Sequence, residues 1–95
     1  MKKTQKAPQK KLKSSDFRMA FEENKMHLNV ARTIERLRLK SGLTQKELAE
    51  KAGVSQPMIA RMEKGDPTRT PTLSTISTIL GALGYKLDII IKKAA

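Results

Sequence analysis

Two long polar side chains, Gln56 and Arg61, lie in a short segment that begins at Ser55. On a helix in the major groove of DNA, a glutamine amide pairs with N6 and N7 of adenine, and an arginine guanidinium pairs with O6 and N7 of guanine. Ser55 can contact a base or a phosphate, while Pro57 and Met58 offer apolar surface to a thymine methyl group. For Met58, a packing role within the protein is as good an interpretation as contact with DNA. These residue types predict sequence readout on double-stranded DNA.

The overall composition favours a polyanionic partner over an enzymatic role. Lys and Arg number 20 against 9 acidic residues, which gives a net charge of +11, and such an excess favours nucleic acid or an anionic membrane surface. The chain has no Cys and a single His, His27, so disulfides, thiol catalysis and cysteine-based zinc sites are excluded. Metal-assisted hydrolysis would need clustered carboxylates, which the sequence lacks. We therefore expect no catalytic residues, metal, cofactor or small-molecule substrate.

The sequence predicts neither a membrane protein nor an exported one. No apolar run approaches the roughly 20 residues of a membrane-spanning helix. The basic start of the chain lacks the apolar stretch of a signal peptide. It also lacks the amphipathic face that binding at a membrane surface requires. We expect a cytoplasmic protein with no membrane contact.

Two short helices joined by a tight turn would position the base-reading side chains. Thr44 and Glu47 have the spacing of a capping box at the start of the first helix, and Gly53 ends this helix. Ser55 caps the second helix, which runs to about residue 64. An ordinary helical hairpin is the alternative, but two capped starts so close together favour a helix-turn-helix. The second helix of that motif enters the major groove.

Three exposed cations around this motif are candidates for phosphate contacts. They are Lys46, Lys64 and Arg69, and Arg69 could also reach the minor groove. For each cation alone, a solvated surface charge is an equally good interpretation. Their common placement around the motif favours contact with the DNA backbone.

The flanking segments complete a mainly α-helical chain. The spacing of apolar residues predicts helices over 15–23 and 28–41, with Asn24 and Lys25 between them, and a further helix over 72–83. Residues 1–14 are rich in Lys and poor in apolar side chains, so we expect a disordered basic arm. This arm could be a solvated tail or a DNA contact. Residues 15–95 would then form one DNA-binding domain.

The last segment changes its period from helical to alternating. Its apolar side chains Tyr85, Leu87, Ile89 and Ile91 alternate with mostly charged neighbours, which predicts a β-strand. A lone strand leaves its backbone polar groups unpaired. We therefore expect it to pair with its copy in a homodimer, or with a partner protein. A symmetric dimer would place two recognition helices about one DNA turn apart, roughly 34–36 Å, on a palindromic operator.

The central motif resembles the lambda-repressor-like helix-turn-helix family, also called the XRE family. The matching string is Gly42-Leu43-Thr44-Gln45, Glu47-Leu48-Ala49, Gly53-Val54-Ser55-Gln56 and Ile59-Ala60-Arg61-Met62-Glu63-Lys64-Gly65. The resemblance implies a five-helix domain, here with an extra N-terminal helix and the C-terminal strand. It also implies a partly buried ion pair between Arg38 and Glu63. Gln45 would lie against the DNA backbone and bridge toward Gln56, whereas Pro57 departs from the polar residue often found at its position.

The segments before and after the helix-turn-helix motif resemble those of HigA-type antitoxins. The residues that carry this resemblance are Asp16-Phe17, Ala20-Phe21-Glu22-Glu23 and Ala82-Leu83-Gly84-Tyr85-Lys86-Leu87; the Lys-rich arm is a departure. The resemblance implies a repressor that regulates its own toxin-antitoxin operon and neutralises a HigB/RelE-like mRNA interferase. The alternative is a free-standing XRE-family repressor of a phage or mobile element, with no toxin partner.

Overall fold

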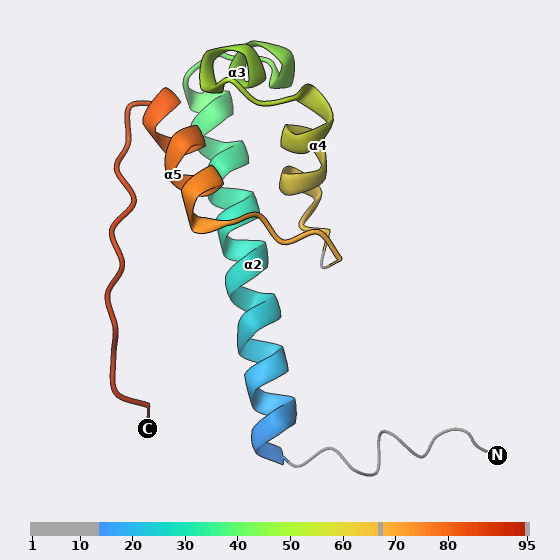
Figure 1. Ribbon diagram of the computed structural model, residues 1–95, viewed down its shortest axis with the longest axis vertical. Coiled ribbons are helices and arrows are strands. Elements are labelled where there is room, and N and C mark those ends of the chain that lie inside the picture. The colour runs from blue at the N-terminus through green and yellow to red at the C-terminus, as the bar shows by residue number, and fades with distance from the viewer. Residues whose placement is uncertain (1–13, 67, 95) are drawn as a thin grey trace, which may run out of the picture.

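The computed structural model describes residues 14–66 and 68–94, and Figure 1 shows how their helices are arranged. The helices are α2 (Ser14–Lys40), α3 (Gln45–Ala52), α4 (Gln56–Lys64) and α5 (Leu73–Ala82). The mainly helical prediction is confirmed. The predicted basic arm falls on residues outside those described, apart from Ser14, which begins α2.

A small aliphatic core joins the four helices at one end of α2. The fully buried large side chains are Ile34, Leu48, Ile59 and Ile79, and each comes from a different helix. In Figure 1, α3 crosses the end of α2, and α4 and α5 lie on either side of α2. Burial of such side chains stabilises the fold by about 1.5–3 kcal/mol each. The core therefore fixes the relative placement of α3 and α4.

The structure corrects the prediction of two helices before residue 41. Ser14–Lys40 is one helix of 27 residues, and it passes through Asn24 and Lys25 without a break. Neither residue carries the large penalty of Gly or Pro in a helix interior, since Asn costs at most about 0.7 kcal/mol relative to Ala. A local loss of apolar periodicity was therefore a poor signal for a helix end. The resulting helix is about 40 Å long, and its N-terminal part extends away from the core (Figure 1).

The C-terminal segment is not a strand in the described part of the chain. Residues 85–94 have no regular secondary structure, and the predicted strand and five-helix count are not confirmed. A β-strand needs a neighbour for its backbone hydrogen bonds, and a single chain supplies none here. Leu87 nevertheless packs against the hydrophobic core, while Ile89 and Ile91 are exposed.

No helix in the described ranges is both long enough and apolar enough to cross a membrane.

Candidate nucleic-acid interface

The helix α3 begins with the predicted capping box. The backbone N–H of Glu47 donates to Thr44 Oγ1 at 3.0 Å, and the N–H of Thr44 donates to Glu47 Oε1 at 2.8 Å. These two bonds satisfy donors that a helix start otherwise leaves without partners. The capping box prediction is confirmed, and it fixes Thr44 as the N-cap residue of α3.

A three-residue turn connects α3 to α4. Gly53 has a φ of 73°, in the left-handed region that favours glycine. The N–H of Val54 then donates to the carbonyl of Ala49 at 3.0 Å. Ala49 and Ile59 are both buried under this turn, and the small alanine lets the two helices approach closely. The predicted helix-turn-helix geometry is therefore present.

The first turn of α4 faces solvent. Ser55 Oγ accepts the backbone N–H of Met58 at 3.2 Å, and Pro57 lies in the first turn, where a missing N–H costs no helical hydrogen bond. Ser55, Gln56 and Pro57 are exposed. An exposed and rigidly capped helix start is the part of a recognition helix that contacts base edges.

The opposite end of α4 is tied to α2 and α3 through Glu63. Arg38 Nε donates to Glu63 Oε2 at 2.7 Å and Arg38 Nη2 donates to Glu63 Oε1 at 3.0 Å, so the pair is bidentate. Both side chains are largely buried. Arg38 Nη1 also donates to the carbonyl of Leu43 at 2.8 Å. The hydrogen bond with Glu63 raises the pKa of Arg38 above its ordinary value. The two residues that the family resemblance paired are thus in contact.

The side chain of Gln45 belongs to the same cluster. Its Nε2 donates to Glu63 Oε1 at 3.1 Å, and it is half-buried. The expected bridge toward Gln56 is not formed between these two described side chains. No local pattern predicts the bond to Glu63, because it joins residues 18 positions apart on different helices.

Arg61 of α4 and Arg69 of the following loop line the same hollow. The hollow has a volume of about 240 Å³ and is also lined by Met58 and residues of the loop and α5. Arg61 and Met58 are half-buried, and Arg69 is exposed. The sequence alone had placed Arg69 only loosely near the motif. The structure therefore puts a predicted base reader and a predicted backbone contact on one surface.

The loop that carries Arg69 is organised by Asp66. The carboxylate oxygen Oδ1 accepts the backbone N–H of Thr68 at 2.9 Å and its hydroxyl at 2.6 Å. These hydrogen bonds hold the pKa of Asp66 below its ordinary value. His27 Nε2 lies 3.0 Å from the carbonyl oxygen of Asp66, which links the loop to α2. Sequence reasoning missed both the carboxylate's role and the contact of His27.

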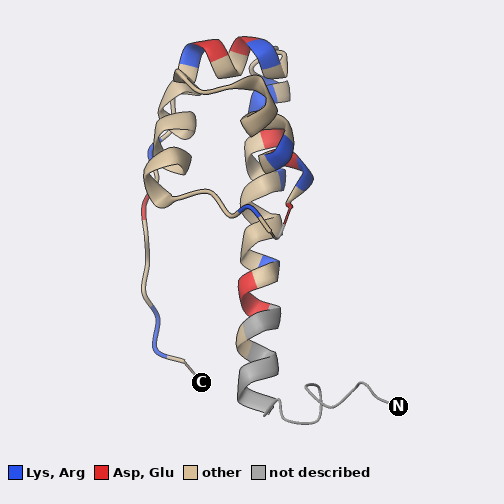
Figure 2. Cartoon of the chain, turned by 45° about the vertical axis from the view of Figure 1, so that its right-hand side comes forward, with Lys and Arg blue, Asp and Glu red and all other residues tan. Residues whose placement is uncertain are grey.

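Lys46 and Lys64 are exposed cations on α3 and α4. Figure 2 shows Lys and Arg on α3, on α4 and in the following loop, with some acidic residues between them. The predicted dimer residues Tyr85, Leu87, Ile89 and Ile91 lie elsewhere, in the C-terminal segment on the far side of the core from α4 (Figure 1). The DNA-binding candidates and the dimer candidates therefore occupy separate surfaces.

Among residues 14–66 and 68–94, no three His, Cys, Asp or Glu side chains are grouped as metal ligands would be.

Comparison with known proteins gives a family and several relatives. The helix-turn-helix family matches residues 34–90, which is more than half of the chain. A protein of Haemophilus influenzae named "Uncharacterized HTH-type transcriptional regulator" is 37% identical over 68 residues, 72% of this chain and 67% of that protein. The immunity repressor protein of Bacillus phage phi105 is 36% identical over 64 residues, 67% of this chain but only 43% of the phage protein.

The chain is also similar to a solved structure, described as a toxin-antitoxin module from Streptococcus pneumoniae, over most of the length of both chains. The TM-score is 0.64 with 31% sequence identity, and the match covers 88% of this chain and 86% of the other. The family match includes both helices of the capped motif and the segment up to Ile90. The chain therefore belongs to the XRE-type helix-turn-helix family of DNA-binding transcriptional regulators.

Proposed function

We propose that this regulator represses transcription by inserting α4 into the major groove of an operator. The observation that carries the proposal is the exposed first turn of α4, held by the Ser55 cap at one end and by the Glu63 cluster at the other. Gln56 would read adenine and Arg61 would read guanine. Ser55, Pro57 and Met58 would complete the contact with base edges and thymine methyl groups.

Backbone contacts would surround this readout. The proposed phosphate contacts are Gln45, Lys46, Lys64 and Arg69. Lys46, Lys64 and Arg69 are exposed, and Gln45 begins α3, where the positive end of the helix dipole favours an anion. Contacts of this kind fix the register of a protein on DNA without reading its sequence.

The regulator would bind its operator as a homodimer. One domain of this size spans few base pairs, so a symmetric pair on a palindrome would supply the missing affinity. The proposed dimer interface consists of Tyr85, Leu87, Ile89 and Ile91. Three of these side chains are exposed in the single chain, as an interface requires.

The biological role would be that of a HigA-type antitoxin. The similarity to a structure described as a toxin-antitoxin module, over 88% of this chain, supports this role. The partner would be a HigB/RelE-like toxin that cleaves mRNA, and the complex would regulate its own operon. A second candidate is a free-standing phage repressor, which the similarity to the phi105 immunity repressor supports.

Operator binding is tested with the duplex that lies upstream of the chain's own reading frame. Fluorescence anisotropy at fixed salt would compare this duplex with a scrambled one. Gln56→Ala and Arg61→Ala should each lower the preference for the operator by about tenfold, because each removes a bidentate base contact. Lys86→Ala removes one exposed charge in the C-terminal segment, outside the proposed readout, and it should keep the preference. Unchanged preference in both α4 variants would contradict the proposed readout.

The toxin partner is tested separately by affinity capture from the native host. A high-salt wash removes electrostatic DNA contacts and spares an apolar protein interface. A stoichiometric small protein that arrests growth when it is expressed alone would support the antitoxin role. Recovery of the homodimer alone would favour the free-standing repressor.

A further inference from the structure

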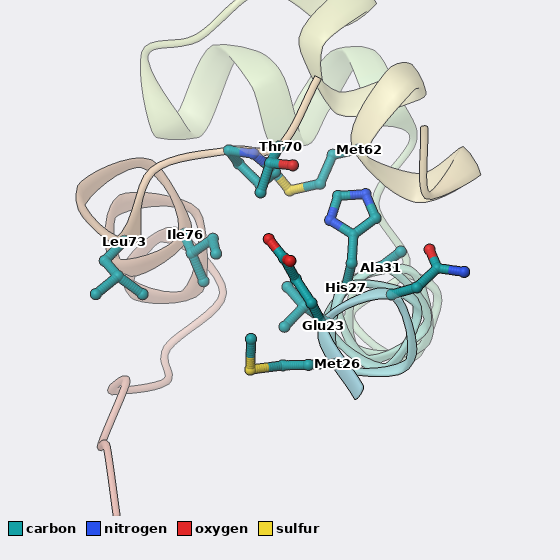
Figure 3. A pocket seen from close by; sticks show the side chains of 11 residues that line it. Glu23, Met26, His27, Ala31, Met62, Thr70, Leu73 and Ile76 are labelled. Carbon is teal, nitrogen blue, oxygen red and sulfur yellow. The ribbon is translucent and has the colours of Figure 1, made fainter. Parts of the chain in front are cut away.

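A groove runs between α2 and α5 and is bordered by Met62 of α4 and by Thr70 and Pro71 of the loop before α5. Its volume is about 530 Å³, and Figure 3 shows the side chains that line it. The lining is mainly apolar: Met26, Val30 and Ala31 from α2, Met62 from α4, and Leu73 and Ile76 from α5. Met26 and Leu73 are exposed on the two sides of the opening. A hollow with this lining is suited to apolar side chains.

The groove is lined by one acidic side chain, Glu23. Glu23 extends from α2 toward the middle of the groove (Figure 3), and Glu22 precedes it in the sequence. In a chain with a net charge of +11, this local negative charge disfavours nucleic acid at the groove. It favours an occupant that combines apolar and cationic side chains.

The C-terminal segment of this chain has that composition. Ile89, Ile90 and Ile91 are exposed, the last of them to 92%, and Lys92 and Lys93 follow them directly. Consecutive large apolar side chains with this exposure are typical of an interaction site. In an extended backbone, Ile89 and Ile91 share a face with Leu87, which packs against the core. The two isoleucines therefore continue the apolar side of the segment beyond Leu87, but they are exposed in the single chain.

We propose that the C-terminal segment of a second copy of the chain occupies this groove, with Ile89 and Ile91 between Met26 and Leu73 and with the following lysines beside Glu23. This inference rests on the homodimer proposed above and names where its two copies touch. The occupant comes from a second copy because the segment of the same chain runs along the far side of α5 from α2 in both views (Figures 1 and 2).

A mutual exchange of C-terminal segments between two copies would also give each segment a partner for its backbone hydrogen bonds. Two C-terminal segments can pair with each other as a two-stranded ribbon, but an isolated ribbon is marginal in water without a covering layer. The groove provides this layer for its apolar face. Because Leu87 packs against the core of its own chain, residues 88–93 are the part that would reach across, and they span about 20 Å when extended.

Site-directed crosslinking tests the contact directly, because the chain has no Cys of its own. Full-length Met26→Cys and Ile91→Cys proteins would be mixed and oxidised, so that a crosslink between the two can form only between copies. We expect a dimer-sized product joining residues 26 and 91. Leu39→Cys is the matched control, since Leu39 also lies on α2 and is 61% exposed, against 62% for Met26, but it does not line the groove. Equal crosslinking from Leu39→Cys would overturn the proposal.

Sedimentation of charged variants measures the effect on dimer affinity. Met26→Glu and Leu73→Glu should each raise the dimer dissociation constant by about tenfold or more, as expected for an anchor pocket. Leu39→Glu should leave the constant within about twofold, because surface changes outside an interface have small effects. Exchanging the charges, with Glu23→Lys in one protein and Lys92→Glu with Lys93→Glu in the other, should favour the mixed dimer over either homodimer.

The outcomes separate this inference from the proposed function. A dimer that forms normally but gives no crosslink between residues 26 and 91 would overturn the groove contact and leave the homodimer intact. A protein that stays monomeric on its operator would overturn both. A crosslink that forms only within one chain carrying both Cys substitutions, or a groove filled by a captured toxin instead, would also overturn the proposal.

Discussion

The carboxylate of Glu63 is the point where three helices meet. It accepts hydrogen bonds from Arg38 on α2 and from Gln45 at the start of α3, while it belongs to the last turn of α4. A largely buried arginine needs such a partner, because an unpaired charge in the interior is costly. The orientation of α4 relative to the rest of the motif therefore depends on this one side chain.

Replacing this carboxylate should be strongly destabilising. Glu63→Gln keeps the shape of the side chain but leaves the Arg38 charge without its partner, so we expect a loss of about 3 kcal/mol in the free energy of unfolding. Urea unfolding followed by circular dichroism would measure it. Glu50→Gln on the exposed face of α3 is the control and should change stability by less than about 0.5 kcal/mol. Equal effects of the two substitutions would contradict the role of the ion pair.

Asp66 supports the loop that carries Arg69, and this support depends on pH. Because hydrogen bonds from Thr68 hold the pKa of Asp66 below its ordinary value, the carboxylate stabilises the loop fully above the pKa of an unfolded aspartate, about 3.9. The contribution is lost as the pH falls through the lower pKa of the folded state. Thr68→Ala removes the hydroxyl donor, so the pKa of Asp66 should rise. Carboxyl NMR titration would measure the shift, and an unchanged pKa would refute this explanation.

At the scale of elements, α4 is short and is fixed by its two ends. Gly65 ends it with a φ of 70°, and a Cβ at this position would lie 2.7 Å from Leu28 Cδ2. The glycine thus answers two requirements: a left-handed backbone conformation, and room for the flexible end of the half-buried Leu28 side chain, which would have to shift to admit a Cβ. Gly53, with a φ of 73°, meets only the first requirement, because a Cβ there would have nothing within 4 Å.

This difference predicts two distinct costs for the same substitution. Gly53→Ala should destabilise by about 1 kcal/mol through backbone strain alone. Gly65→Ala should cost somewhat more, since the Leu28 side chain must also shift to admit the added Cβ. Thermal or urea unfolding of the two variants gives the comparison. A smaller cost for Gly65→Ala than for Gly53→Ala would show that α2 does not pack closely on the end of α4.

Elements with local signals could be predicted from the sequence, and those with distant partners could not. The capping box of Thr44 and the glycine ends of α3 and α4 depend on neighbouring residues, and the sequence located them well. The length of α2 was missed, because Asn24 interrupts the apolar pattern without breaking backbone hydrogen bonds. The bond of Gln45 to Glu63 and the contact of His27 with Asp66 join distant segments. Such contacts exist only once the helices have packed.

At the scale of the whole molecule, the two proposed surfaces lie on opposite sides of a small core. The exposed turn of α4 and its surrounding cations lie on one side, and the C-terminal segment lies on the other (Figure 1). In the proposed arrangement, this separation would let one chain bind DNA while its second surface contacts a protein. The strand predicted over residues 85–91 is not formed in the single chain, because its hydrogen-bonding partner would come from another chain.

In the proposed function, α4 reads a specific DNA sequence as one half of a symmetric pair. Selection of bound duplexes from a random pool at physiological salt tests it most directly, because no operator needs to be known in advance. We expect a palindromic consensus with half-sites about one helical turn apart, roughly 10–10.5 base pairs. Gln56→Ala should change this consensus at a defined position of each half-site. Enrichment of no sequence, or a consensus that is the same for the Gln56→Ala and Arg61→Ala variants as for the unaltered chain, would contradict it.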